Sequence, residues 1–208
     1  MKVLKFGGSS VAKPENIVKI KNIISEYNDQ IILVVSALGG VTDLLLEAGS
    51  LASSQDQTYK KILSTLEERH LTSIKELLPV TAQSKVLSKV KSEFNVLETL
   101  LEGAYFIGEI TPKLSDKIVS YGELLSSYII SEYLISEQLD AEFKDSRELI
   151  ITQTVNGKNR VNFTRTNSNC ADYFNTSNKK ISVCPGFIAT SEEGVSTTLG
   201  RGGSDYTA

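Results

Sequence analysis

A lysine and a pair of glycines near the start of the chain have the types and spacing of a phosphate-binding turn. Lys5 precedes Gly7 and Gly8, and the hydroxyls of Ser9 and Ser10 follow at once. Two successive glycines let a ligand approach bare backbone N–H groups, and such a turn before a helix suits an anion, above all phosphate. A glycine pair in an ordinary β-turn or bulge, beside a surface lysine, explains this stretch equally well.

The pattern around this turn predicts a strand, a helix and a second strand. Residues 2–5 form a short apolar start, residues 14–27 show helical spacing of apolar side chains, and residues 31–35 are a continuous apolar run rich in β-branched residues, typical of a buried parallel strand. A second Gly-Gly turn with hydroxyls, 36–42, follows that strand. Parallel strands end at one edge of a sheet, where ligands bind, so we expect the two turns to lie side by side.

A long helical segment, about 44–139, follows these turns and is expected to pack beside the sheet or form an inter-subunit surface. In its last helix, spacing of three and four residues places Glu123 beside Ser126 and Ser127. The residues alone favour a solvated polar face over a helix that presents one carboxylate to a pocket. His70, the only histidine, falls on an apolar stripe, which favours a buried structural histidine over a general base or ligand.

The remainder of the chain predicts short strands around one helix. The strands are expected at about 141–143, 150–152, 181–184 and 188–190, and the helix at about 160–174. A third glycine-rich loop, 200–205, adds Arg201. The chain has no Gly-Lys-Ser or Gly-Lys-Thr of a P-loop, and Asp205 stands where the three-glycine dinucleotide pattern requires its last glycine.

Composition restricts the class of protein. The 208 residues are 40% hydrophobic and 23% charged, as in ordinary soluble globular proteins. A net charge of -3 gives no support for nucleic-acid binding, and no apolar run is long enough to cross a membrane. Cys170 and Cys184 lack CxxC spacing, which argues against a metal site and fits a reducing compartment. We therefore expect a cytoplasmic protein without a cleaved leader.

Five spaced motifs together resemble the aspartate kinases. In the family's order they are Lys5-Phe6-Gly7-Gly8-Ser9-Ser10, residues 36–42, Tyr121-Gly122-Glu123-Leu124, Gly186-Phe187 and Leu199-Gly200-Arg201-Gly202-Gly203-Ser204-Asp205-Tyr206. Two departures are visible: the family commonly has Thr where this chain has Ser9, and Asn where it has Asp43. The first keeps the hydroxyl, and the second adds a negative charge to which the motif gives no role.

The resemblance implies a fold and an activity. The fold is an α/β class, three-layer α/β/α sandwich with a mainly parallel sheet, the amino-acid kinase fold. The reaction is phosphorylation of the L-aspartate side-chain carboxylate by ATP with Mg²⁺, giving 4-phospho-L-aspartate for lysine, threonine and methionine synthesis. Residues 1–208 would be the amino-terminal, amino-acid-binding lobe, ending before the nucleotide-binding half.

The resemblance also implies roles for individual residues. Lys5 would bridge the phosphate oxygens, with Gly7, Gly8 and Ser9 as hydrogen-bond donors, and Asp205 would orient Lys5 or hold water on the metal. Arg201 suits bidentate capture of the substrate α-carboxylate, and Glu123 suits the substrate ammonium, which reverses the preference for a solvated face. No side chain is assigned as a metal ligand. The rest of the amino-acid pocket would be Ser36, Thr42, Phe187, Gly202 and Ser204.

The end of the chain soon after the third glycine loop predicts a fragment with little or no kinase activity alone, cut from a homo-oligomeric, allosterically regulated parent. The helical segment is compatible with a bifunctional aspartokinase/homoserine dehydrogenase parent. Two alternatives stay open. One is another amino-acid kinase, acting on glutamate, N-acetylglutamate, uridylate or carbamate. The other is a non-catalytic lobe that binds aspartate or mediates oligomerisation.

Overall fold

The computed structural model describes residues 1–155 and 158–208, with only the backbone of Lys158. The strands are β1 (Lys2–Phe6), β2 (Ile31–Val35), β3 (Ala141–Phe143), β4 (Ile151–Val155), β5 (Lys158–Val161), β6 (Ile181–Pro185), β7 (Ile188–Ser191) and β8 (Ser196–Thr198). The α-helices are α1 (Pro14–Ser25), α2 (Val41–Ser53), α3 (Tyr59–Leu77), α4 (Val80–Ile107), α5 (Pro112–Ser136), α6 (Phe163–Thr176) and α7 (Gly203–Thr207). A 3₁₀ turn, η1 (Ser146–Glu148), precedes β4.

A four-stranded parallel sheet in the order β1-β2-β6-β3 positions the loops of interest. Phe6 pairs with Val35, and Val35 pairs with Pro185, so three strands end in register at one edge. The segments that follow them begin at Gly7, Ser36 and Gly186. The predicted strand–helix–strand order and the parallel pairing of the first two strands are therefore confirmed.

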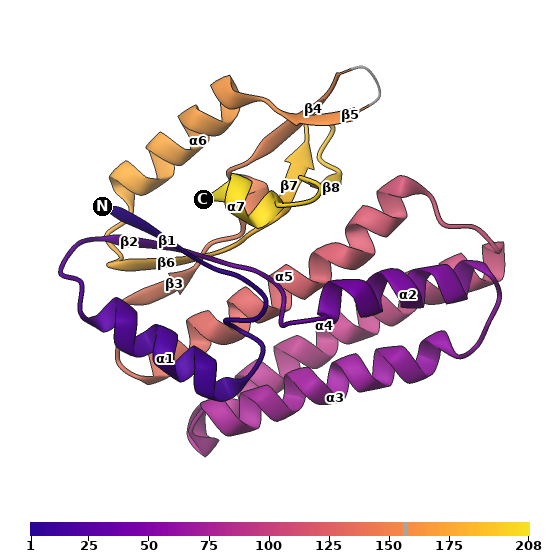
Figure 1. The fold of residues 1–208 in the computed structure, drawn as a ribbon, viewed down its shortest axis with the longest axis horizontal. Helices are drawn as coiled ribbons and strands as arrows, with labels where there is room; N and C mark the ends of the chain where they lie inside the picture. Colours follow the sequence, from indigo (N-terminus) through magenta and orange to yellow (C-terminus); the bar gives the residue numbers. More distant parts are fainter. Residues whose placement is uncertain (156–157) are drawn as a thin grey trace.

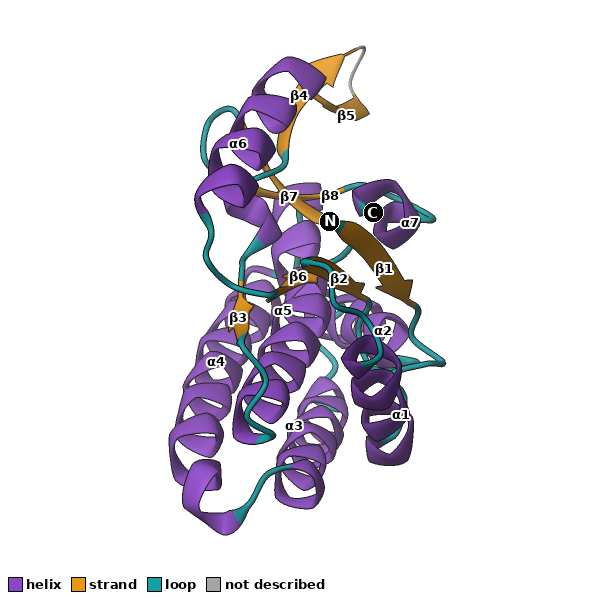
Figure 2. Ribbon diagram, turned by 90° about the vertical axis from the view of Figure 1, so that its left-hand side faces the viewer, coloured by secondary structure: helices purple, strands orange, loops and turns teal. Residues whose placement is uncertain are grey.

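Helices lie on both sides of this sheet (Figures 1 and 2). Ile31, Leu33 and Val35 are buried in the main core with the apolar faces of α1–α5. Alternate residues of the same strand, Ile32 and Val34, point to the opposite face, where they line a hollow together with residues of α6 and the last residues of the chain. The chain thus has the predicted α/β class with a parallel sheet.

A second four-stranded sheet, β5-β4-β7-β8, lies beyond the first. β4 and β7 are parallel, whereas β5 and β8 are antiparallel additions at its edges. The sequence predicts separate strands at about 181–184 and 188–190, but it does not reveal that the chain changes sheet between them. A hairpin joins β7 to β8, with Gly194 at φ +80°.

The helix predicted from about residue 160 is wrong at its start. Lys158–Val161 instead pair as β5 with β4, and α6 begins at Phe163. Asn162 caps α6, because its side-chain oxygen accepts a hydrogen bond from the backbone N–H of Arg165 at 3.2 Å. Pairing with a neighbouring strand overrides the helical pattern of the residues before this cap.

The predicted helical segment corresponds to α2–α5, which pack on one another and on the sheet. His70 lies on α3 with 1% of its surface exposed, and its Nδ1 lies 2.7 Å from the Leu66 carbonyl oxygen. The ring meets Phe94 edge-on at 5.4 Å between centroids. The structural interpretation of this histidine is confirmed by its burial.

Acidification should destabilise the fold through His70. A carbonyl only accepts, so Nδ1 carries the proton and Nε2 is buried without a hydrogen-bond partner. Burial lowers the pKa of His70 from 6.5 to about 4, so its stabilising contribution is present above pH 6.5 and is lost as pH falls towards 4. Linkage gives a loss of about 2 kcal/mol between pH 7.5 and 5. Because the raised pKa of Glu123 acts in the opposite direction over this range, urea unfolding should show the loss as a fall in the stability of the wild type relative to His70→Leu between the two pH values. An equal pH dependence of the two proteins would contradict the assignment.

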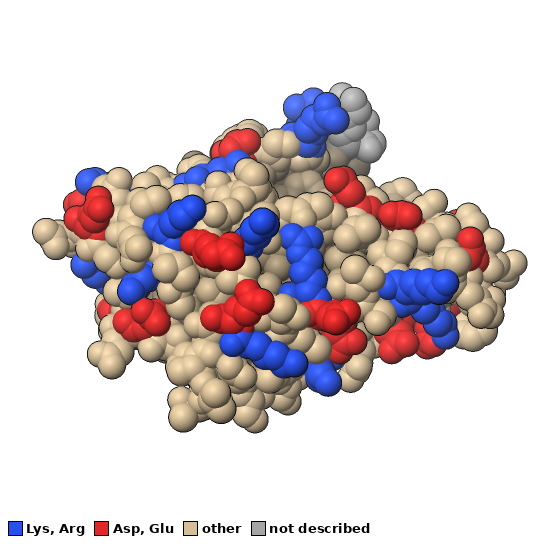
Figure 3. All heavy atoms as spheres, turned by 60° about the horizontal axis from the view of Figure 1, so that its bottom comes forward, with Lys and Arg blue, Asp and Glu red and all other residues tan. Residues whose placement is uncertain are grey.

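Charge on the helical side of the molecule is mixed. Figure 3 shows Lys and Arg side chains interspersed with Asp and Glu over this face. No helix within the described residues has an apolar stretch that would cross a membrane.

Candidate active site

The three glycine-rich segments meet in a hollow of about 330 Å³ at the carboxyl edge of the parallel sheet. This volume lies at the lower end of the range of small-molecule sites. Eleven of the twelve predicted site residues line it: Lys5, Gly7, Gly8, Ser36, Thr42, Glu123, Phe187, Arg201, Gly202, Ser204 and Asp205. The exception is Ser9, which is exposed and lines a separate hollow with Asn16 and Lys19.

The turns after β1 and β2 touch through their backbones. A Cβ added to Gly8 would lie 3.2 Å from the Ala37 carbonyl oxygen, and one added to Gly39 would lie 3.1 Å from the Gly8 carbonyl oxygen. Glycine therefore allows the close approach that the sequence predicts. Gly40, at φ +80°, is the N-cap of α2 and makes no side-chain cap. Thr42 and Asp43, in the first turn of α2, line the hollow, and the N-terminus of a helix favours an anion.

Lys5 and Asp205 form an ion pair beside the first turn. Lys5 Nζ lies 2.7 Å from Asp205 Oδ1, with side-chain exposures of 28% and 72%. A Cβ on Gly7 would lie 3.5 Å from the same Nζ, so the ammonium group folds back over that glycine. The carboxylate at the start of α7 therefore fixes the lysine of β1 above the backbone of the glycine turn.

Glu123 is buried rather than solvated, with 4% of its surface exposed. Its Oε1 accepts a hydrogen bond from the Ala37 N–H at 3.3 Å, while Oε2 is buried without a hydrogen-bond partner. Burial raises the pKa of Glu123 from 4.5 to about 7. The solvated-face interpretation is therefore wrong. Ser126 and Ser127 do not line the hollow and instead donate to the carbonyls of Ser36 and Glu123 at 2.8 and 2.6 Å.

The third loop packs against the turn after β6. Ser36 Oγ donates to Ser204 Oγ at 3.0 Å, and a Cβ on Gly186 would lie 2.6 Å from Ser204 Oγ. Phe187 has φ +68°, an unusual conformation for a bulky residue. Its N–H donates to Thr207 Oγ1 at 3.0 Å, which helps to hold this strained backbone. The ring of Phe187 thereby becomes one wall of the hollow.

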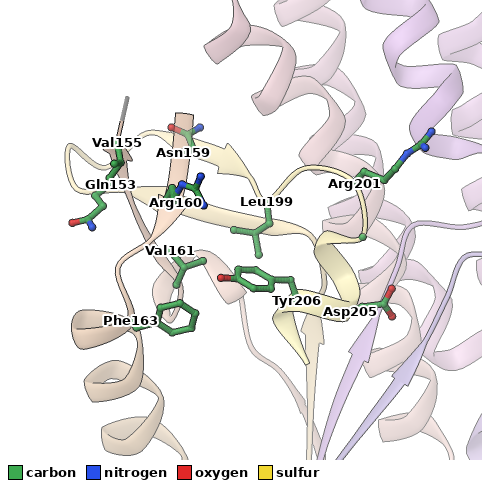
Figure 4. A pocket seen from close by; sticks show the side chains of 11 residues that line it. Gln153, Val155, Asn159, Arg160, Val161, Phe163, Leu199, Arg201, Asp205 and Tyr206 are labelled. Atoms are coloured by element: carbon green, nitrogen blue, oxygen red, sulfur yellow. The ribbon is translucent and has the colours of Figure 1, made fainter. Parts of the chain in front are cut away.

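Arg201 stands between two hollows. A neighbouring hollow of about 780 Å³ lies between the β4–β5 hairpin and α7 and also borders Arg201 and Asp205. In Figure 4 these two side chains point away from Phe163 and Tyr206, which face that neighbouring hollow. Among the described residues, no carboxylate lies within 4.0 Å of the Arg201 guanidinium. Its donors are therefore free for a ligand carboxylate.

Two carboxylates in or near the site have no role that the sequence assigns. Asp43 lines the hollow from the first turn of α2 and is exposed, which places the extra negative charge at the rim. Asp116, on α5, accepts hydrogen bonds from the N–H and Oγ1 of Thr198 at 3.2 and 2.9 Å. It ties β8, which leads into the third loop, to the helix that carries Glu123. No local pattern around Asp116 signals this contact.

The hollow thus combines two cations, a buried carboxylate and exposed backbone N–H groups beside a glycine turn. This set suits a ligand with an ammonium group, more than one carboxylate and a phosphoryl group close by. In α/β folds with parallel strands, ligands bind at this carboxyl edge of the sheet, where the hollow lies.

The chain belongs to the amino acid kinase family, whose sequence profile matches residues 1–208. It is 31% identical over 209 residues to bifunctional aspartokinase/homoserine dehydrogenase 2, chloroplastic, of Zea mays, a match that covers 99% of this chain and 23% of that protein. The structure is similar to that of Escherichia coli aspartokinase III in complex with lysine and aspartate, with a TM-score of 0.87 and 28% sequence identity. The match covers 99% of this chain and 45% of that one. The same enzyme with aspartate and ADP has a TM-score of 0.86. The chain spans less than half the length of each.

Proposed function

We propose that this chain supplies the aspartate-binding and phosphoryl-transfer part of an aspartate kinase. The whole protein would use ATP to phosphorylate the side-chain carboxylate of L-aspartate, giving 4-phospho-L-aspartate for lysine, threonine and methionine synthesis. The observation that carries the proposal is the buried carboxylate of Glu123, which lines the same hollow as Lys5 and Arg201 and whose Oε2 has no hydrogen-bond partner among the described residues. Similarity to aspartokinases, one of them solved with aspartate, supports it.

Substrate recognition follows from matching charges. L-Aspartate carries one ammonium and two carboxylates. The hollow offers the buried carboxylate of Glu123 and two cations, with the exposed carboxylates of Asp43 and Asp205 also in its lining. Arg201 would hold the α-carboxylate through two parallel hydrogen bonds. Glu123 would take the ammonium, and this cation would favour the ionised form of a carboxyl group whose pKa burial raises to about 7. Binding should therefore weaken as pH falls below about 7.

The remaining carboxylate of the substrate is the nucleophile. Its reference pKa of about 3.9 leaves it ionised at neutral pH, so the reaction needs no general base. One oxygen of this carboxylate would bond to the terminal phosphorus of ATP as the bond from that phosphorus to the leaving group, ADP, breaks. Lys5 and the N–H groups of Gly7 and Gly8 would stabilise the negative charge on the transferred phosphoryl group. The protein's contribution is positioning and charge stabilisation.

The residues of this chain fit the phosphate end of a nucleotide. Lys5 Nζ lies directly over Gly7, at the edge where α2 also presents its uncapped first turn. ATP would supply the phosphoryl group, with Mg²⁺ neutralising phosphate charge. The described residues contain no group of three or more His, Cys, Asp or Glu side chains that could hold a metal ion, so no metal ligand is assigned.

We further propose that these residues alone turn over little ATP, since the similar E. coli enzyme is more than twice as long.

Calorimetry with Arg201→Ala tests the substrate assignment. Loss of a charge-assisted bidentate contact should weaken L-aspartate binding about 100-fold, corresponding to roughly 3 kcal/mol. Arg165→Ala is the matched control, because Arg165 is exposed and pairs with Glu192 at 3.5 Å outside the hollow. Unchanged affinity in the Arg201 variant would remove the basis of the proposal. Tighter binding of L-glutamate than of L-aspartate by the wild type would point to another amino acid kinase.

A further inference from the structure

Arg69 joins the helical layer to both glycine turns of the site. It lies on α3 and is partly buried. Its Nη1 donates to the Gly39 carbonyl oxygen at 2.7 Å, and its Nη2 donates to the Ala12 carbonyl oxygen at 3.2 Å. Gly39 directly precedes Gly40, the N-cap of α2, and Ala12 directly precedes Lys13, the N-cap of α1. One planar guanidinium therefore binds the residue directly before the N-cap in each of two successive strand-to-helix connections.

The two connections depend on each other at this point. They follow β1 and β2, whose last residues, Phe6 and Val35, are paired. A Cβ on Gly39 would lie 3.1 Å from both the Ala12 Cβ and the Gly8 carbonyl oxygen. The two connections therefore approach too closely for a side chain at Gly39. Gly8 and Gly39 both line the hollow, so their spacing sets part of its width.

Helix capping gives a second reason to assign a role to Arg69. Neither α1 nor α2 has a side-chain hydrogen bond at its N-cap. An Asp or Ser cap would occupy first-turn N–H groups that an anionic ligand could use. The Arg69 guanidinium fixes the entry to both helices through carbonyl groups. Among the described residues, the N–H groups of Thr42 and Asp43 in the first turn of α2 have no hydrogen-bond acceptor.

Electrostatics points the same way. The Arg69 guanidinium donates to two carbonyl oxygens, so the position requires a hydrogen-bond donor, and its positive charge lies near the N-terminus of α2. The same positive charge favours an anion bound in front of the turns. Arg69 thus supplies both the donors that the two carbonyl oxygens require and a positive charge behind the turns.

We propose that Arg69 is a positioning residue that holds the turns after β1 and β2 at the spacing required for the phosphoryl group and the substrate. It lies outside the residues that line the hollow and acts through the backbone of Gly39, Ala12 and Gly8. Arg69 thereby couples α3, and with it the helical layer, to the site. That this spacing serves a phosphoryl group and L-aspartate rests on the proposed function. That Arg69 orders the two turns does not.

The test combines hydrogen–deuterium exchange without ligand and calorimetry with L-aspartate. In Arg69→Met, amides of residues 7–13 and 38–43 should exchange at least tenfold faster, while those of β1 and β2 stay protected. The dissociation constant for L-aspartate should rise about tenfold. Arg69→Lys should give a smaller effect on both readouts, because one ammonium does not reproduce the paired guanidinium donors. Lys61→Met, an exposed change on the same helix, should leave both unchanged.

The outcomes separate this inference from the proposed function. Faster exchange spread over the whole helical layer, in proportion to a fall in global stability, would reduce Arg69 to a structural residue and overturn the inference. Unchanged exchange in both turns would overturn it as well. If Arg69→Met does not fold, the same criteria apply to Arg69→Lys. If the wild type shows no L-aspartate binding, the proposed function fails, while the exchange measurement still decides whether Arg69 orders the turns.

Discussion

Replacing Lys5 by methionine in the intact gene product is expected to lower kcat 100- to 1,000-fold. Lys5 Nζ lies over Gly7 and is held by Asp205 at 2.7 Å, so it is in place before the phosphoryl group carries extra charge. Removing one preorganised group of this kind typically costs about 10²–10³ in rate. The loss should appear in kcat, with KM for L-aspartate changed by less than about threefold, since we propose that Glu123 and Arg201 hold the substrate.

Trapping of the acyl phosphate with hydroxylamine measures this effect, because only the phosphorylated carboxylate gives a hydroxamate. Lys2→Met provides the matched control on the same strand. Lys2 lies at the other end of β1 and pairs with Asp29 at 3.0 Å. Equal kcat values for the two variants would show that Lys5 does not take part in phosphoryl transfer.

Glu123→Gln should have two large and opposite effects. The amide keeps an oxygen for the Ala37 N–H but loses the charge that holds the substrate ammonium, so L-aspartate binding should weaken at least 100-fold. At the same time the variant should be more stable than the wild type at pH 8. Burial raises the pKa of Glu123 from 4.5 to about 7, so the ionised group is disfavoured in the folded protein.

The sign of this stability effect follows from linkage. The protonated carboxyl group is favoured by folding below pH 4.5, and this advantage is lost as pH rises through 7. Removing the ionisable group should therefore stabilise the fold by roughly 3 kcal/mol at pH 8 and by less than about 1 kcal/mol at pH 5. Urea unfolding at both pH values measures it, with Glu132→Gln on the same helix as control. A variant that binds L-aspartate normally, or is less stable at pH 8, contradicts the assigned role.

Local patterns predict the part of the site that depends on the parallel strands. The β-branched run of β2 and the glycine pairs after β1 and β2 suffice to place Gly8 next to Gly39, because parallel strands in register end at one edge. The pairing of Lys5 with Asp205 follows only from the family resemblance, since the two residues lie at opposite ends of the chain.

Distant contacts explain what the sequence does not reveal. Glu123 and its neighbouring serines look like a solvated helix face, yet the turn at Ser36 and Ala37, far earlier in the chain, covers them. Arg69 resembles any polar residue of an amphipathic helix until the carbonyls of two other segments reach it. The change of sheet after β6 likewise depends on non-local strand pairing.

Amide chemical-shift mapping of the chain during titration with L-aspartate tests the central claim most directly, because it locates even weak binding. The account predicts saturable shifts at the glycines of the three loops, Gly7, Gly8, Gly39, Gly40 and Gly202, all of which line the hollow. These shifts should be absent in Glu123→Gln. Saturable shifts confined to the neighbouring hollow between the β4–β5 hairpin and α7, or no saturable shifts at all, would contradict it.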